Sequence, residues 1–268
     1  MHFEVKGLVL RETPVRDNDR YLDILTAEMG RLSVYARGVR SIKSKNTAST
    51  MVLTYAVFTL DRQREDFIVL VESEKLEYFN DSRLGLEINS LCMYICDVLR
   101  EVTLPNEEQD DVLRLALNSL HALTNRLYSP ELIKSAFELR LMSEVGYMPD
   151  LTECEGCGNA SAEGGYQLDI MNGVLLCPKC AETRLEMPPD DGRALILAPL
   201  SATAVDAMRY IVRAPLRRLF AFRCEDTVLS EMSAACERYL LNQMERSFLT
   251  LSFYKQVKHL PKPEEKQD

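Results

Sequence analysis

The chain has 268 residues, of which 46% are hydrophobic, and it carries a formal net charge of −9 at pH 7. This length suits two or three domains with a substantial core, and no apolar run is long enough for a membrane-spanning helix. Because a secretory signal is not recognisable either, we expect a cytoplasmic protein whose eight cysteines are metal ligands or core thiols rather than disulfides.

Five short stretches within residues 1–80 have the pattern of β-strands, and they cover residues 3–13, 21–27, 31–39, 51–61 and 66–73. In the third, Leu32, Val34 and Ala36 alternate with more polar side chains, which marks a strand with one buried face. Five short strands that could pair antiparallel predict a small closed barrel. The five-stranded OB-fold is the natural candidate, and an SH3-like barrel is the main alternative.

A basic segment lies on the third strand and the loop that follows it. It contains no acid and five cations, which are Arg31, Arg37, Arg40, Lys43 and Lys45. Tyr35 is interleaved with them. Cationic side chains follow a phosphate backbone and aromatic faces stack on bases, so this segment is a candidate DNA-binding surface. The alternative is a solvated strand face on an ordinary barrel.

From Leu84 onward the apolar residues recur at helical spacing. The pattern predicts helices over residues 84–104, 112–127, 129–146, 201–214 and 227–246. Serine caps are expected at Ser129 and Ser201. Four cysteines in or beside these helices, namely Cys92, Cys96, Cys224 and Cys236, are assigned to core packing, because free cysteine is among the most buried residue types.

Two Cys-x2-Cys pairs, Cys154 with Cys157 and Cys177 with Cys180, stand nineteen residues apart. This spacing is typical of a four-thiolate zinc site. Four protein ligands close the coordination sphere, so the sequence predicts one structural Zn²⁺. Strand-like residues flank Asn172-Gly173, for which we expect a type I′ turn with two positive φ angles. The whole pattern predicts a zinc ribbon, and two unrelated redox-active pairs are the alternative.

No phosphate-binding loop, dinucleotide fingerprint or nucleophile elbow is found in the sequence, so we expect a protein that is not an enzyme. A second run without acids lies between residues 207 and 223. Its arginines form a secondary basic patch or the polar side of an amphipathic helix, and they include Arg209, Arg213, Arg217 and Arg218.

With these features in place, the chain resembles the bacterial RecO family of DNA repair and recombination proteins. The resemblance is carried by Gly7–Leu10, by Tyr35–Arg40 and, most specifically, by Phe137–Pro149 leading into Cys154. The closing segment Phe248–Tyr254 also fits. Some members of the family lack the four cysteines, which this chain keeps.

The resemblance implies a non-enzymatic recombination mediator that binds single- and double-stranded DNA and anneals complementary strands. With RecR, such a protein helps to load RecA onto strands coated by the single-stranded-DNA-binding protein. It also docks the acidic C-terminal tail of that coat protein on its helical domain, where Arg126, Lys134 and Arg140 are candidate contacts. Two alternatives are an RNA-binding zinc-ribbon module of translation or transcription, and a thiol redox sensor.

The expected fold class is therefore α+β with several domains. Residues 1–80 form an OB-fold barrel, residues 81–150 and 186–254 form a helical domain, and residues 151–185 form an inserted zinc ribbon. Residues 255–268 are short, charged and proline-containing, and they are expected to be a disordered tail.

Overall fold

A computed structural model describes residues 1–258 apart from residues 16, 42, 66 and 187–194. These residues form two compact units. Unit 1 consists of residues 1–124 and the segment that begins at Phe248, and unit 2 is Asn125–Ser247. No helix within the described ranges is both long and apolar enough to cross a membrane.

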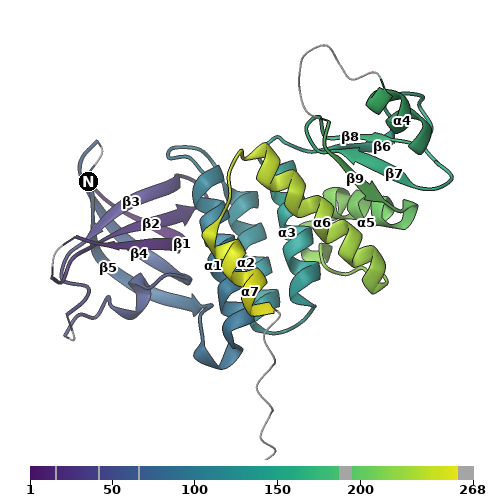
Figure 1. Cartoon of the computed structure of the whole chain (residues 1–268). Coiled ribbons are helices and arrows are strands. Elements are labelled where there is room, and N and C mark those ends of the chain that lie inside the picture. The colour runs from purple at the N-terminus through teal and green to yellow at the C-terminus, as the bar shows by residue number, and fades with distance from the viewer. Residues whose placement is uncertain (16, 42, 66, 187–194, 259–268) are drawn as a thin grey trace, which may run out of the picture. The chain divides into compact units, whose positions relative to one another are not determined.

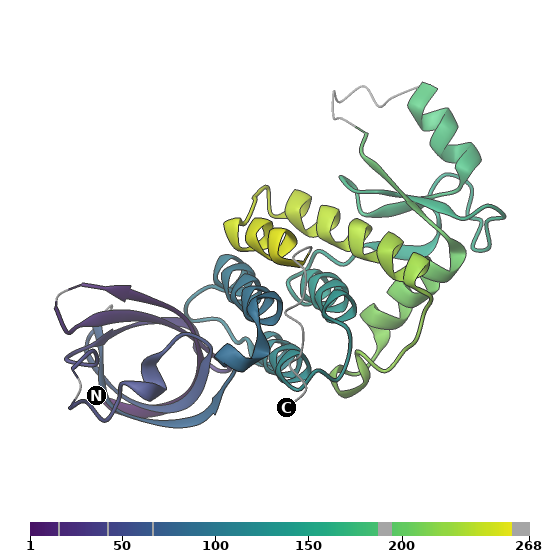
Figure 2. The same ribbon diagram turned by 60° about the horizontal axis from the view of Figure 1, so that its bottom comes forward.

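Unit 1 begins with a five-stranded closed barrel, whose strands curve into a ring (Figures 1 and 2). The strands are β1 (His2–Pro14), β2 (Arg20–Thr26), β3 (Gly30–Ala36), β4 (Thr54–Arg64) and β5 (Phe67–Tyr78). Their order is β1-β2-β3-β5-β4, with β4 pairing back onto β1. Only the β3–β5 pair among these neighbours is parallel. The OB-fold prediction is confirmed.

The alternation of apolar and polar side chains decides which residues fill the barrel. Leu22, Ile24 and Val34 are fully buried inside it, whereas Tyr21 and Tyr35 are only half-buried. Successive side chains of a strand point to opposite faces, so the two tyrosines lie on the outside of the barrel. The remaining barrel core consists mainly of Val5, Val9, Leu32, Ala36, Ala56, Phe58, Leu60, Ile68 and Leu70.

Three helices complete unit 1, and they are α1 (Leu86–Val102), α2 (Asp110–Thr124) and α7 (Leu249–Lys258). Short 3-10 turns, η1 (Ala48–Thr50) and η2 (Ser82–Leu84), lie in the connections. Cys92 and Cys96 are fully buried in α1, as predicted. Helix α7 packs against α1, and Phe248, directly before α7, meets Tyr94 of α1 edge-to-face at a centroid distance of 5.8 Å. Residues 255–258, expected to be disordered, are thus helical, and the rest of that tail lies outside the described residues.

Unit 2 combines helices with a small sheet of order β6-β8-β7-β9. Its elements are α3 (Pro130–Glu144), β6 (Asp150–Cys154), β7 (Tyr166–Asp169), β8 (Val174–Leu176), α4 (Pro178–Glu186), β9 (Leu197–Leu200), α5 (Ala202–Arg213), η3 (Leu216–Arg218) and α6 (Asp226–Gln243). Both predicted caps are present, because Ser129 and Ser201 accept backbone N–H bonds at the starts of α3 and α5. Cys236 is buried as predicted, but Cys224 is only half-buried.

The β7–β8 hairpin is confirmed, but its turn is not the expected type I′. Of the two turn residues only Gly173 has a positive φ, of 68°. The Gly173 N–H donates to the Asp169 carbonyl at 2.8 Å, and the Asp169 side chain accepts the N–H groups of Met171 and Asn172. Asp169 therefore organises the turn through its own carboxylate, as aspartate commonly does.

Candidate metal centre and nucleic-acid interface

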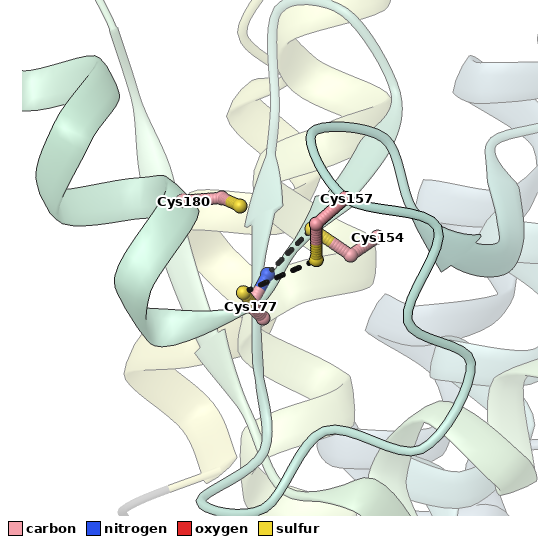
Figure 3. A group of neighbouring side chains, drawn as sticks. All are labelled: Cys154, Cys157, Cys177 and Cys180. Carbon is pink, nitrogen blue, oxygen red and sulfur yellow. Dashed lines mark hydrogen bonds between the residues drawn. The ribbon is translucent and has the colours of Figure 1, made fainter.

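The four cysteines of the two Cys-x2-Cys pairs meet at one point in unit 2. Cys154 and Cys157 come from the end of β6 and the loop after it, Cys177 lies between β8 and α4, and Cys180 is in the first turn of α4 (Figure 3). All four Sγ atoms lie within 4.8 Å of one another, and those of Cys157 and Cys177 are 3.8 Å apart. Four sulfurs at about 2.3 Å from a tetrahedral ion would be about 3.8 Å apart, whereas a disulfide needs about 2.05 Å. The spacing therefore fits metal ligands.

Two glycines allow the first pair to wrap this tightly. A Cβ atom at Gly156 would come within 2.9 Å of the Cys180 sulfur. Gly158 has a φ of 69° and donates its N–H to the Cys154 carbonyl at 2.8 Å. Gly156 is therefore needed because a side chain would collide with Cys180, and Gly158 is needed because its backbone has a positive φ.

Backbone N–H groups in the cluster also favour the thiolate form of Cys154. Burial raises the pKa of Cys154, but N–H groups, among them that of Cys177 at 3.1 Å, outweigh burial and lower the pKa to about 7. By contrast, the neighbouring Cys177 thiol and then burial raise the pKa of Cys180 to about 12. Thiolates this close repel one another, and a cation held among them removes that penalty. The donor set is therefore suited to a thiophilic divalent ion.

Arg184 on α4 forms ion pairs with two acidic residues close to the cysteines. Its guanidinium pairs with Glu155, next to the first ligand, and with Asp169 at 3.5 Å. Asp169 is fully buried, and it also holds the β7–β8 turn. One residue on α4 thus links both Cys-x2-Cys pairs to the hairpin between them.

The five cations of the basic segment lie at two separate places on the barrel. Arg37, Arg40, Lys43 and Lys45 are exposed on the loop that follows β3, and we call these four the basic loop. Arg31 lies at the other end of β3, where its Nε donates to the Thr103 carbonyl at 3.1 Å. Arg31 therefore anchors the barrel to the end of α1 and does not share a surface with the other four.

The basic loop is held in a fixed conformation at its beginning. The Gly38 N–H donates to Asp19 Oδ1 at 2.8 Å, and the Arg40 N–H donates to the Asn18 carbonyl at 3.1 Å. Thr47 donates its hydroxyl to the Val39 carbonyl at 2.7 Å. The first two bonds tie the start of the loop to the β1–β2 connection. Farther on, the loop runs along β5, where the Ser73 N–H donates to Asn46 Oδ1 at 3.1 Å.

The outer face formed by β4 and β5 carries more acids than cations, with Lys6 and Lys75 exposed among the glutamates. Glu72 and Glu74 are exposed there, opposite Thr59 and Val57 of β4, and Glu4 lies beside Thr59 on β1. A polyanion is repelled from such a face and attracted to the basic loop. Among these surfaces of the barrel, the basic loop is therefore the one that attracts nucleic acid.

In the structure, Tyr35 also contacts an aromatic ring, that of Phe67, which the sequence did not predict. Tyr35 lies between Tyr21, at a centroid distance of 5.2 Å, and Phe67, at 5.9 Å. Phe67 is remote from Tyr35 in the sequence and reaches it through the parallel β3–β5 pairing. No local pattern in the sequence signals that contact.

Two of the three candidate contacts for an acidic tail have internal roles instead. Lys134 is only 3% exposed and pairs with Glu138 and Glu237 at 2.9 and 3.0 Å. Burial lowers its pKa, but the two carboxylates outweigh burial and raise it. Arg140 donates to the carbonyls of Ile211, Val212 and Ala214 at the end of α5, so it is also committed within unit 2. These two assignments are corrected, and Arg126 alone is exposed.

Replacing Arg140 by methionine is expected to lower the free energy of unfolding of unit 2 by about 2 kcal/mol, since bonds from a charged donor are lost. Chemical denaturation measures this as a lower midpoint with an unchanged slope. Arg126→Met is the matched control and should stay within about 0.5 kcal/mol of the wild type. Equal midpoints for the two variants would contradict the anchoring role of Arg140.

The secondary basic patch is also only partly available. Arg209 donates to the Leu151 and Thr152 carbonyls at 2.6 and 2.7 Å and so joins α5 to β6. Arg213, Arg217 and Arg218 are exposed. Three of the four predicted arginines can therefore meet a ligand.

Comparison with known proteins matches nearly the whole chain to two family models. The family described as Recombination protein O, N terminal, matches residues 1–79, and the one described as Recombination protein O, C terminal, matches residues 83–252. The DNA repair protein RecO of Acetivibrio thermocellus is 31% identical, over 95% of this chain and 96% of the relative. That of Symbiobacterium thermophilum is 28% identical over 94% and 96%. The chain therefore belongs to the RecO family of DNA repair proteins.

Proposed function

We propose that the protein is a recombination mediator that binds single- and double-stranded DNA through the basic loop of its barrel and anneals complementary strands. The observation that carries the proposal is the set of four exposed cations on one loop of an otherwise acidic chain. Its membership of the RecO family supports DNA as the ligand. The exposed Arg213, Arg217 and Arg218 provide a secondary contact.

Contacts to phosphates carry no base information, so binding through the basic loop is nearly independent of sequence. Annealing needs this property, because it must act on any complementary pair. Neutralising the phosphates of two strands also removes much of the repulsion that slows their pairing. The protein achieves this by binding, without a chemical step.

The four cysteines are proposed to hold one Zn²⁺. Zinc prefers tetrahedral thiolate sites, and a site with four protein ligands has no position for water. The metal supplies folding energy to the β6–β9 sheet rather than chemistry. Within the same proposal, the protein partners are RecR and the acidic C-terminal tail of the single-stranded-DNA-binding protein. Together they allow RecA to be loaded onto the coated strand. Arg126 is the exposed candidate contact for the tail.

An annealing assay tests the proposal. Two complementary labelled oligonucleotides should pair faster in the presence of the purified protein than in its absence, without ATP and without ATP hydrolysis. A preference for RNA with no annealing would instead support a module of translation or transcription. DNA binding that appears only after mild oxidation and metal release would support a redox sensor. Either outcome would overturn the mediator function.

A further inference from the structure

Three aromatic side chains form a continuous row across the outside of the barrel. Tyr21 on β2, Tyr35 on β3 and Phe67 on β5 follow one another at centroid distances of 5.2 and 5.9 Å. Tyr21 and Tyr35 are direct partners in the β2–β3 register. We call these three residues the aromatic row, and each of them is half-buried.

The row does not contribute to the barrel interior. An adjacent residue on each strand, namely Leu22, Val34 or Ile68, points inward and is at most 6% exposed. Because side chains alternate along a strand, the three rings must lie on the opposite, outer face. A barrel core therefore does not account for three adjacent rings at this place.

The row is connected to the basic loop by one carboxylate. The Tyr35 hydroxyl donates to Asp19 Oδ2, and Asp19 Oδ1 accepts the Gly38 N–H at 2.8 Å. Asp19 thus fixes the ring of Tyr35 beside the residue at which the basic loop begins. A hollow of about 470 Å³ opens at this end of the row, lined by Tyr35, Arg37, Asp17, Asn18 and Asp19.

We infer that the aromatic row stacks unpaired bases of a DNA strand whose phosphates are held by the basic loop, so that the protein prefers single strands to duplex. This inference rests on the proposed DNA-binding function. Stacking on aromatic side chains is available to any base, because every base has a π-face. In a duplex the faces are already covered by neighbouring bases, so the row adds affinity for single strands alone.

Tyr55 provides a matched control on the same barrel. It lies on the outer face of β4, is half-buried like the row, and pairs with Glu77 on the acidic face. Burial, and then the carboxylates of Glu28 and Asp110, raise its pKa. Tyr55 is not part of the aromatic row, so its removal should not change the preference for single strands.

The test measures the dissociation constants of the full chain for a labelled oligothymidylate and for a duplex of the same length. Tyr21→Leu and Phe67→Leu, which keep an apolar side chain, should each lower the ratio of duplex to single-strand dissociation constant about tenfold. Tyr21→Phe keeps the ring and should retain the wild-type ratio. Tyr55→Leu should also retain it.

Two results would overturn the inference. One is an unchanged ratio in both leucine variants while the wild type binds DNA, and the other is an equal fall in the Tyr55→Leu control. A wild-type chain that binds neither oligonucleotide would instead overturn the proposed function, and the inference with it. Comparing each variant on two ligands makes a loss of folded protein visible, because it weakens both equally.

Discussion

Replacing Cys154 by serine is expected to release the bound metal and to destabilise unit 2 by several kcal/mol, while the barrel keeps its fold. Cys154 is fully buried, and its sulfur accepts the Cys177 N–H at 3.1 Å. In small zinc modules the metal contributes an apparent ~10–16 kcal/mol to folding. Unit 2 also has helices packed on its sheet, so part of it should persist without metal, and the loss should be a fraction of that energy.

Metal analysis and thermal unfolding measure this outcome together. Freshly purified wild-type protein should contain one zinc per chain, and a strong chelator should lower the midpoint of the unit 2 transition. Cys224→Ser is the matched control, because Cys224 is a half-buried thiol outside the cluster. A wild-type zinc content well below one per chain, or full metal retention in Cys154→Ser, would refute the metal site.

Replacing Arg37, Arg40 and Lys43 together by alanine is expected to weaken single-strand binding about 100-fold at ~0.1 M salt. Each phosphate contact on a single strand contributes about 0.7 to the slope of log affinity against log salt. Three lost contacts therefore change the slope by about two, which over the tenfold range from ~0.1 to ~1 M salt corresponds to about two units of log affinity. All three side chains are exposed, so the fold and the metal content should not change.

The control for this variant must change the charge by the same amount elsewhere on unit 1. Lys6, Lys75 and Arg114 are exposed cations on β1, β5 and α2, and replacing them by alanine also removes three positive charges. Screening limits the reach of a surface charge to about 10 Å at 0.1 M salt, so this control should bind DNA nearly as well as the wild type. An equal loss in both triple variants would assign the effect to net charge.

The elements that the sequence predicted best are those with a strong local pattern. Alternation along residues such as Leu32, Val34 and Ala36 reports a barrel interior directly, because one strand face is buried and the other is not. The cysteine spacing is equally local. The four sulfurs meet as expected. Within each pair only two residues intervene, and the pairing of β8 with β6 and β7 brings the two pairs together.

Contacts made across the fold could not be predicted in this way. Phe67 joins Tyr35 only because β3 and β5 pair in parallel. Residues 132–139 of α3 are all buried, so the helix has no solvated face on which Lys134 could lie. The sequence shows an apolar stripe with a cation beside it, but the direction of that cation is decided by α6 and its Glu237.

Short elements were also missed. Strands β6 and β9 and helices α4 and α7 are too short for a periodic pattern to stand out. The β7–β8 turn departs from the Asn-Gly expectation because the Asp169 carboxylate takes the turn N–H groups. At the turn, a side-chain bond outweighs the local preference.

The dependence of DNA affinity on salt tests most directly whether the basic loop is the DNA-binding surface. Dissociation constants for one oligothymidylate should be measured over a series of salt concentrations for the wild type and for the Arg37, Arg40 and Lys43 triple variant. Three lost contacts should flatten the slope by about two units, at about 0.7 for each contact. A variant with the wild-type slope and affinity would show that these three cations are only a solvated face of the barrel.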